Sequence, residues 1–420
     1  MRVSIGAMIV IGLAYVFITP PMKVPDETLH FFRSAAIARG HMIPNGGGRP
    51  DSASIPQGLK TLVWVMSWVD KNGKFNKPQY EAAIRIPLEP VKQPTVEFPS
   101  WYTPVPFLPQ AFAFVVARVA NIRPLIAFYA GRVFNLAVAL TLIAIAMRVA
   151  TSYRNIIAAT ALLPMSMFEL ASFSADAMTF ALAVLFTALL VEGGGTAALI
   201  VVAFLLGVCK PAYFFLAFLV FAIPGRTVRS KVGVLASMAI ATVVAFWYAH
   251  MAAYQQRGGI PIDPASQLAC VIHDPMRFVR LAVSDIAGHS RYYLEGLIGR
   301  FGLNEFSLPI AVVILEILTL FAAALTSKRT LTPVGRLVAT AIVIATVAGV
   351  MLSQYMVWSI VCGDAIEGVQ GRYFLPILPL ALLAISFSIP RLRLDARVLA
   401  AIALVCNAFA FVAILRRYWI

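Results

Sequence analysis

The chain has 420 residues, of which 60% are hydrophobic and 13% are charged, and its formal net charge is +15 at pH 7. Soluble globular domains are about 45–50% apolar and about 25% charged, so this composition excludes a soluble enzyme and indicates a polytopic membrane protein. The positive charge does not indicate nucleic-acid binding, because much of it lies in short clusters beside apolar segments, as the positive-inside rule expects.

Apolar segments recur along the chain, each suited to a full or partial crossing at about 20 residues per transmembrane helix. They are 3–19, 105–121, 125–147, 155–171, 176–191, 196–209, 211–223, 232–251, 308–326, 336–353, 372–389 and 397–415. We therefore expect an all-α, multi-pass integral membrane protein with about 11–12 transmembrane helices in a single membrane domain, 1–420. Two polar stretches, 20–104 and 252–307, are expected to be large outer loops, the first of them carrying juxtamembrane helices.

The first apolar segment leads directly into a pair of acids, Asp26 and Glu27. It ends in Thr19-Pro20-Pro21 rather than in a small-residue cleavage site, so we expect a retained membrane anchor. A carboxylate held near lipid is partly desolvated and can take a proton from a sugar hydroxyl, which makes both acids candidate catalytic bases. The alternative is that they orient a juxtamembrane helix that begins near Thr28.

His30 and Arg33 follow these acids on one helical face, three residues apart. We predict that His30 contacts the substrate and that Arg33 helps to bind a donor phosphate. For His30, a packed and hydrogen-bonded histidine is the alternative.

Three clusters of lysine and arginine in short connections set the expected orientation. If the segments between them cross alternately, all three clusters fall on one side, which is then cytoplasmic. The clusters are Arg226, Arg229 and Lys231; Lys328, Arg329 and Arg336; and Arg391, Arg393 and Arg397. This count gathers both large loops, Asp176, Lys210 and the segment 354–371 on the outer side.

The same count requires that 105–121 does not cross the membrane completely. Prolines bracket this segment at 104, 106, 109 and 124. We therefore predict that it is re-entrant or interfacial. The C-terminal Arg416 and Arg417 then lie on the outer side.

Asp176 and Lys210 interrupt apolar sequence and are predicted to bind substrate and donor phosphate, respectively. A carboxylate at mid-bilayer costs roughly 2.5–3.5 kcal/mol, so Asp176 should lie at the membrane edge or in a wet cavity. Ser174 or Asp176 could instead cap the helix that follows. Lys210 precedes Pro211 and needs an anionic partner, and the alternative is that its side chain reaches to the interface.

The second large outer loop combines basic and aromatic residues at helical spacing, which could grip a phosphate and stack on a sugar. We predict that His289 and Tyr292 bind substrate. An amphipathic helix lying on lipid is the alternative, above all for Arg277 and Arg280.

Arg372 begins an apolar segment, where its charge opposes the helix dipole. A bidentate grip on the donor phosphate would explain it, with Gln370 and Tyr373 as substrate-binding neighbours. The alternative is interfacial anchoring by the Arg372–Tyr373 pair.

The four cysteines form no C-x-x-C pattern, which argues against a zinc site. Cys270 and Cys362 both fall in expected outer loops, where a disulfide between them could form, although sequence alone does not supply the geometry. P-loop, Rossmann and H-E-x-x-H signatures are absent from the sequence as well.

Two motifs carry a resemblance to a known family, and further matches cover nearly the whole chain. The two motifs are Val24-Pro25-Asp26-Glu27-x-x-His30-Phe31-x-Arg33 and Gly368-Val369-Gln370-Gly371-Arg372-Tyr373-Phe374-x-Pro376. The further matches are Ser172-x-Ser174-x-Asp176, Lys210 before Tyr213, and Gly299-Arg300-Phe301-Gly302. Together they resemble the bacterial membrane-protein family called domain of unknown function 2142, which is similar to the C-type (GT-C) membrane glycosyltransferases.

This resemblance implies a GT-C-like fold and a polyprenyl-phosphate-linked sugar as the donor. Asp26 would be the base, Asp176 a second acid and Tyr213 a substrate contact, in the periplasmic half of a bacterial inner-membrane protein. No cofactor is expected; related enzymes vary in metal use, and the sequence itself offers no support for a divalent ion.

We therefore expect an inverting sugar transfer to a cell-envelope glycan or glycolipid acceptor on the periplasmic side. The alternatives are a lipid-linked glycan flippase or transporter and a non-catalytic subunit of an envelope polysaccharide assembly complex. The expected partners are the lipid-linked sugar, the acceptor and the bilayer, without nucleic acid.

Overall fold

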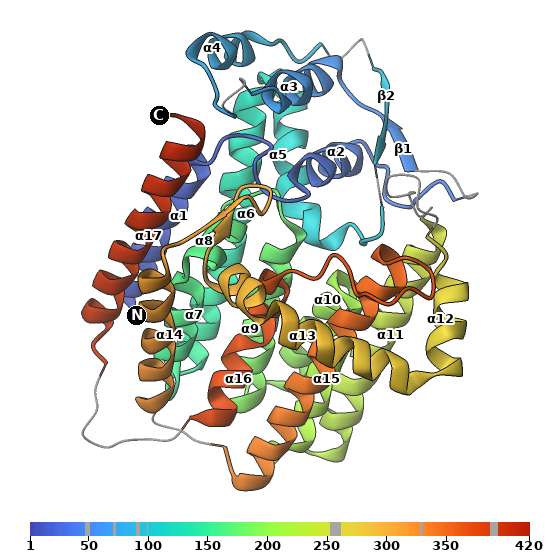
Figure 1. Ribbon diagram of the computed structural model, residues 1–420, viewed down its shortest axis with the longest axis vertical. Helices are drawn as coiled ribbons and strands as arrows, with labels where there is room; N and C mark the ends of the chain where they lie inside the picture. Colours follow the sequence, from blue (N-terminus) through green and yellow to red (C-terminus); the bar gives the residue numbers. More distant parts are fainter. Residues whose placement is uncertain are drawn as a thin grey trace.

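The computed structural model describes residues 1–46, 51–69, 73–89, 93–98, 100–252, 262–327, 331–386 and 394–420 (Figure 1). Within them the regular secondary structure is helical except for two small antiparallel sheets. One pairs β1 (Asp51–Ser54) with β2 (Thr95–Phe98), and the other pairs β3 (Arg300–Phe301) with β4 (Phe306–Ser307). The predicted all-α class is confirmed.

Each apolar segment predicted from the sequence forms helix. These helices are α1 (Arg2–Ile18), η1 (Val105–Phe107), α5 (Leu108–Val119), α6 (Pro124–Val149), α7 (Arg154–Leu162), α8 (Pro164–Leu170), α9 (Ala175–Val191), α10 (Thr196–Cys209), η2 (Pro211–Phe221), α11 (Val228–Met251), α14 (Ile310–Leu325), α15 (Pro333–Trp358), η3 (Gly371–Ile377), α16 (Leu378–Ile385) and α17 (Ala396–Tyr418). The first polar stretch adds α2 (Glu27–Ile37), α3 (Gln57–Ser67) and α4 (Lys77–Arg85), and the second adds α12 (Pro264–His273) and α13 (Pro275–Ile298).

Full-length spans are fewer than the 11–12 crossings expected. In the described residues, α6, α11, α15 and α17 are long and apolar enough to cross a membrane, and α8 with α9 makes a fifth if their 116° bend is counted as one broken span. The other apolar helices have 10–17 residues. Proline is one physical reason, because Pro164 and Pro211 each start a new helical element where the apolar sequence runs on.

Hydrogen bonds between distant segments define the two ends of the molecule. At one end, Trp419 Nε1 donates to the carbonyl of Ile18 at 2.8 Å, and Phe75 N donates to the carbonyl of Tyr418 at 2.9 Å. The C-terminus therefore lies beside the first outer loop, as expected, and we call this the outer end (top of Figure 1).

The short connections between the apolar helices lie at the opposite end. There Arg226 Nη1 donates to the carbonyl of Gly194 at 2.6 Å, and Asn155 Nδ2 donates to the carbonyl of Leu394 at 2.9 Å. This is the end that the arginine and lysine clusters assign to the cytoplasm. Lys328, Arg329, Arg391 and Arg393 of those clusters lie outside the described residues.

Both flanks of α5 contact the outer end. Thr103 Oγ1 donates to the carbonyl of Val208 at 2.9 Å before the helix, and Arg123 Nη1 donates to the carbonyl of Ile84 at 3.4 Å after it. The helix packs against α2 and α6. This arrangement agrees with the prediction that 105–121 does not cross the membrane.

A disulfide connects the two outer segments that precede and follow α13, α14 and α15. Cys270 on α12 is bonded to Cys362, beyond α15, with a Cα–Cα distance of 5.8 Å. Cys209 and Cys406 are free and buried. The pairing that the sequence left open is thus present, and it brings loop 252–307 against the segment 354–371.

Candidate functional site

A cleft of about 770 Å³, counting the part open to solvent, lies at the outer end. Five separate parts of the chain line it: the start of α2, the segment before η1, the start of α9, the end of α10 and the segment from α15 to η3. Six of the predicted site residues are among its lining: Asp26, His30, Asp176, Lys210, Gln370 and Tyr373. Sequence reasoning missed the eight others, among them Trp101, Tyr102, Gln354 and Trp358.

Asp26 lies at the entrance to α2 with its side chain 44% exposed. Its backbone has a φ of 62°, a left-handed conformation that aspartate tolerates better than most residues. Although Asp26 occupies the N-cap position, its carboxylate makes no capping hydrogen bond. Instead, Oδ2 accepts from Arg372 Nη2 at 2.9 Å. The acid is therefore directed to the cleft rather than to its own helix.

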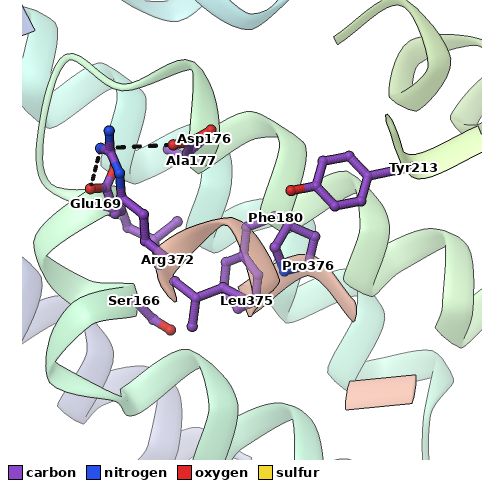
Figure 2. Close-up of a pocket in the computed structure, with 10 residues that line it drawn as sticks. Ser166, Glu169, Asp176, Ala177, Phe180, Tyr213, Arg372, Leu375 and Pro376 are labelled. Atoms are coloured by element: carbon purple, nitrogen blue, oxygen red, sulfur yellow. Dashed lines mark hydrogen bonds and ion pairs between the residues drawn. The ribbon is translucent and has the colours of Figure 1, made fainter. Parts of the chain in front are cut away.

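Arg372 is almost completely buried beside the cleft and joins three acids, two of which, Glu169 and Asp176, are drawn in Figure 2. Besides Asp26, its Nη1 donates to Glu169 Oε1 at 2.8 Å and lies 3.8 Å from Asp176 Oδ2. Such ion pairing to buried carboxylates does not fit an interfacial anchor. Arg372 lines a small adjoining cavity, to which Glu169 and Tyr213 also contribute.

Glu169 is a functional candidate that the sequence reasoning overlooked. It is buried on α8, inside an apolar segment, where an ionisable residue is costly and often functional. This rule, applied to the sequence, could have identified Glu169 as a candidate. Tyr213 donates its hydroxyl to the carbonyl of Tyr373 at 2.7 Å, so it supports the cleft wall from behind rather than lining the cleft.

Lys210 and Asp176 form an ion pair on the cleft wall, with side chains 12% and 14% exposed. The ammonium also lies 5.1 Å from the ring centre of Tyr102 and 4.8 Å from that of Tyr373. Ser174 Oγ accepts from the backbone N–H of Asp176 at 3.1 Å and caps α9. Ser174 thus serves the capping role, and the Asp176 carboxylate remains for Lys210 and Arg372.

His30 is both packed and part of the cleft lining. Its Nδ1 lies 2.9 Å from the carbonyl of Phe173, which can only accept, so Nδ1 carries the proton. Burial lowers the pKa of the imidazole, and the Asp26 and Asp176 carboxylates offset part of that effect. A neutral His30 therefore has Nε2 left as an acceptor.

Glu27 does not line the cleft. Its Oε1 and Oε2 accept from Arg132 Nε and Nη2 at 2.8 and 2.7 Å, and two backbone N–H groups, of Met22 and Phe173, donate to the same carboxylate. All of these groups are buried. The predicted catalytic role of Glu27 has no support in this position, because buried donors already occupy both oxygens.

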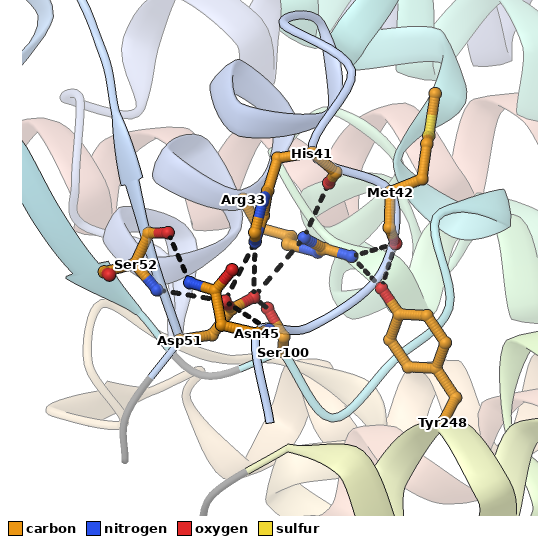
Figure 3. Close-up of polar contacts among 8 residues, drawn as sticks. All are labelled: Arg33, His41, Met42, Asn45, Asp51, Ser52, Ser100 and Tyr248. Atoms are coloured by element: carbon orange, nitrogen blue, oxygen red, sulfur yellow. Dashed lines mark hydrogen bonds and ion pairs between the residues drawn. The ribbon is translucent and has the colours of Figure 1, made fainter. Parts of the chain in front are cut away.

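Arg33 also lies away from Lys210 and Arg372, in a cluster that ties the first outer loop to α11 (Figure 3). It is 3.7 Å from Asp51 Oδ2, it donates to the carbonyls of His41 and Met42, and it contacts the hydroxyl of Tyr248. The sequence placed Arg33 on the same helix as His30, but Asp51, which comes from β1, holds its guanidinium elsewhere.

His289 and Tyr292 lie on α13, outside the cleft lining. His289 Nδ1 is 2.8 Å from Asp285 Oδ1 and its side chain is 62% exposed, while the guanidinium of Arg300 lies 4.8 Å from the ring centre of Tyr292. Arg277 pairs with Asp364, and Arg280 with Asp274. These placements favour the surface-helix alternative for this segment.

The charged network consists of three acids, Asp26, Glu169 and Asp176, around two cations, Lys210 and Arg372. Over the described part of the chain, no three His, Cys, Asp or Glu side chains are placed to hold a metal ion. The cleft thus combines carboxylates, cations held close to its surface and aromatic walls, which is chemistry suited to polar, anionic or sugar-like ligands.

Comparison with known proteins gives a family but no characterised relative. No curated protein and no solved structure matches the chain. The model of the family described as predicted membrane protein (DUF2142) matches residues 9–381, which include Asp26, Asp176, Lys210 and Arg372. The chain therefore belongs to the DUF2142 family of predicted membrane proteins.

Proposed function

We propose that this protein is a membrane glycosyltransferase that moves a sugar from a polyprenyl-phosphate donor to a cell-envelope glycan or lipid acceptor. The reaction would take place on the periplasmic side of the bacterial inner membrane. The observation that carries the proposal is the cleft at the outer end, where Asp26 is exposed and Lys210 and Arg372 lie close by.

In the proposed reaction, Asp26 accepts the proton of an acceptor hydroxyl while that oxygen bonds to the anomeric carbon. The bond from this carbon to the donor phosphate breaks, and its electron pair leaves on the phosphate oxygen. Attack from the face opposite the phosphate inverts the configuration.

The two cations would stabilise the departing phosphate, Lys210 from the cleft wall and Arg372 from beside the cleft. Their pairing with acids does not exhaust them, because an ammonium has three N–H groups and a guanidinium has five. Arg372 Nε is without a hydrogen-bond partner among the residues described. The resemblance of the motifs around Asp26 and Arg372 to the C-type glycosyltransferases supports the same roles.

The test uses purified full-length protein in lipid nanodiscs and radiolabelled hexoses linked to synthetic polyprenyl phosphate. We expect label to pass to an envelope glycan fraction, and Asp26→Asn to slow this transfer about 10²–10⁴-fold. Asparagine suits the left-handed backbone at this position, so the variant should fold. Asp364→Asn, at a residue 91% exposed and outside the cleft lining, is the matched control and should keep wild-type activity. Full activity in Asp26→Asn would remove Asp26 from the role of base.

A lipid-linked glycan transporter is the second candidate, and the break between α8 and α9 favours it. Transporters often bind substrates at discontinuous transmembrane helices, and the 116° bend lies between Glu169 and Asp176. Reconstituted liposomes that hold a fluorescent polyprenyl-phosphate hexose separate the candidates. Movement of the lipid between leaflets without sugar transfer would support the transporter, and neither activity would support a non-catalytic assembly subunit.

A further inference from the structure

We infer that the cleft contains a subsite for the ring of an uncharged sugar, with Trp101 and Gln370 as its specificity-determining residues. This inference rests on the proposed function and names the class of sugar that the site accepts.

Trp101 Nε1 and Gln370 Oε1 are shielded from solvent, and neither has a hydrogen-bond partner among the described residues. Both residues line the cleft. A shielded polar atom without a partner costs free energy, which a ligand that pairs with it recovers. Two residues of the cleft lining therefore hold one unmet donor, an indole N–H, and one unmet acceptor, an amide oxygen, just behind the cleft surface.

A hydroxyl is the group that satisfies both kinds of atom, because it donates one hydrogen bond and accepts others. An ionised carboxylate can only accept, so it cannot pair with Gln370 Oε1. These two residues therefore suit the hydroxyls of a sugar, and Gln370 Oε1 does not suit a carboxylate.

The charges of the cleft also favour an uncharged sugar. Asp26 and Asp176 both line it, and the cations that face them, Arg372 and Lys210, are already paired with them. The phosphate of the donor would take the N–H groups that these two cations have left. A second negative charge on the sugar, as in a uronic acid, would face the two carboxylates without a cation of its own and would be repelled.

The remaining lining suits a pyranose ring. Tyr102, Trp358 and Tyr373 offer aromatic surface against which the apolar C–H faces of a sugar can pack, and Gln354 adds a second amide.

The experiment measures binding directly, apart from any transfer. Saturation-transfer NMR is recorded on full-length protein in nanodiscs with methyl hexopyranosides and with methyl glucuronoside, each titrated through the millimolar range. We expect the neutral hexosides to bind and the glucuronoside to bind at least about tenfold more weakly. Trp101→Phe keeps an aromatic ring without the N–H, and Gln370→Leu keeps the size without the amide; each should raise the Kd of the hexosides about tenfold.

Trp64→Phe, a change at a tryptophan that is 64% exposed on α3 and outside the cleft lining, is the matched control and should leave the Kd unchanged. Thermal unfolding confirms that each variant is folded. Equal binding of hexosides and glucuronoside, or Kd values that neither cleft variant alters, would overturn the inference even if sugar transfer is found. Hexoside binding that depends on Trp101 and Gln370, in a protein with no transfer activity, would retain the subsite and reject the glycosyltransferase.

Discussion

The ion pair between Glu27 and Arg132 fixes the corner at which the chain leaves its first membrane helix. Neither side chain is exposed, and Arg132 also donates to the carbonyls of Val16, Thr19 and Pro20. One guanidinium thus donates hydrogen bonds to carbonyl groups at the end of α1 and to a carboxylate at the start of α2. Because Asp26 is the residue before Glu27, this anchor also places the proposed base.

Replacing Glu27 with glutamine should destabilise the protein strongly. The substitution leaves Arg132 buried without a balancing charge, a change that typically costs about 3–5 kcal/mol. The measurement is thermal or denaturant unfolding of the purified protein in nanodiscs. Glu81→Gln is the control, because Glu81 forms an exposed pair with Lys77 and should cost less than about 1 kcal/mol. An unfolding curve for Glu27→Gln that matches the wild type would contradict the structural role.

His30 should make stability depend on pH below about 6.5. Burial lowers the pKa of the folded-state imidazole, while the unfolded chain keeps the ordinary value of about 6.5. Above that pH both states are neutral. As the pH falls below it, the unfolded state takes up a proton that the folded state does not, so the free energy of unfolding falls by at most about 1.4 kcal/mol per pH unit.

The check compares unfolding of the wild type and His30→Gln between pH 7.5 and 5. The loss of stability assigned to His30 is the difference between the two slopes, which removes the contributions of other groups. Parallel slopes would show that His30 titrates alike in the folded and unfolded states.

Sequence reasoning identified six of the cleft residues because each is a polar residue beside an apolar segment. It could not separate Asp26 from Glu27, which differ in partner rather than in local pattern; Arg132, the partner of Glu27, lies in the middle of a later apolar segment. Trp101 and Tyr102 were missed for a related reason. Aromatic residues in a loop have no periodic signal, and their role appears only when α10 and α15 lie beside them.

The disulfide between Cys270 and Cys362 holds one rim of the cleft. It fastens α12 to the segment that leads from Trp358 to Gln370, and two further contacts reinforce it: Cys362 N donates to Gln267 Oε1, and Arg277 Nη2 donates to the carbonyl of Cys362. The cysteines are 92 residues apart in sequence, so the bond closes a long loop.

Removing this bond should destabilise the protein by about 2–4 kcal/mol, toward the lower end because α14 and α15, within the loop, remain in the membrane when the outer segments unfold. The measurement is the Tm with and without a reducing agent. Reduction should lower the Tm of the wild type to that of Cys270→Ser/Cys362→Ser and leave the double variant unchanged. A wild-type Tm that does not respond to complete reduction would rule out a stabilising bond.

The lengths of the helices were less predictable than their positions. A hydropathy pattern locates apolar sequence but not the breaks within it, such as the turn at Lys210-Pro211 and the bend between α8 and α9. Both breaks bring polar backbone and charged side chains to the cleft. At these two breaks, the interruption of the apolar helix pattern coincides with the site.

At the scale of the whole molecule, the outer end gathers the first outer loop, the C-terminus and the cleft, while the opposite end gathers the basic short connections. In Figure 1, α12 and α13 lie between these ends, at about mid-height. The positive-inside rule predicts from the sequence that the end with the basic connections is cytoplasmic, because charge in short loops is a local property. This prediction depends on one non-local assumption, that 105–121 turns back without crossing.

Site-directed labelling of cysteines in intact cells tests that assumption. The wild-type chain suits this experiment, because none of its own cysteines should react. All four cysteines lie in described residues, two of them buried and two in the disulfide, so a membrane-impermeant maleimide should not label the wild type. Lys60→Cys before α5 and Ala120→Cys after it introduce thiols at exposed positions of the outer end, and Ala197→Cys introduces one at an exposed position of the opposite end.

Because both flanks of α5 face the same way, Lys60→Cys and Ala120→Cys should be labelled from outside the cell, and Ala197→Cys only after permeabilisation. Labelling of Lys60→Cys and Ala120→Cys from opposite sides would mean that α5 crosses the bilayer. Every later segment would then reverse its direction, and the acid at Asp26 could not share a cleft with Lys210, Asp176 and Arg372. The single topological choice at α5 therefore decides whether one site exists at all.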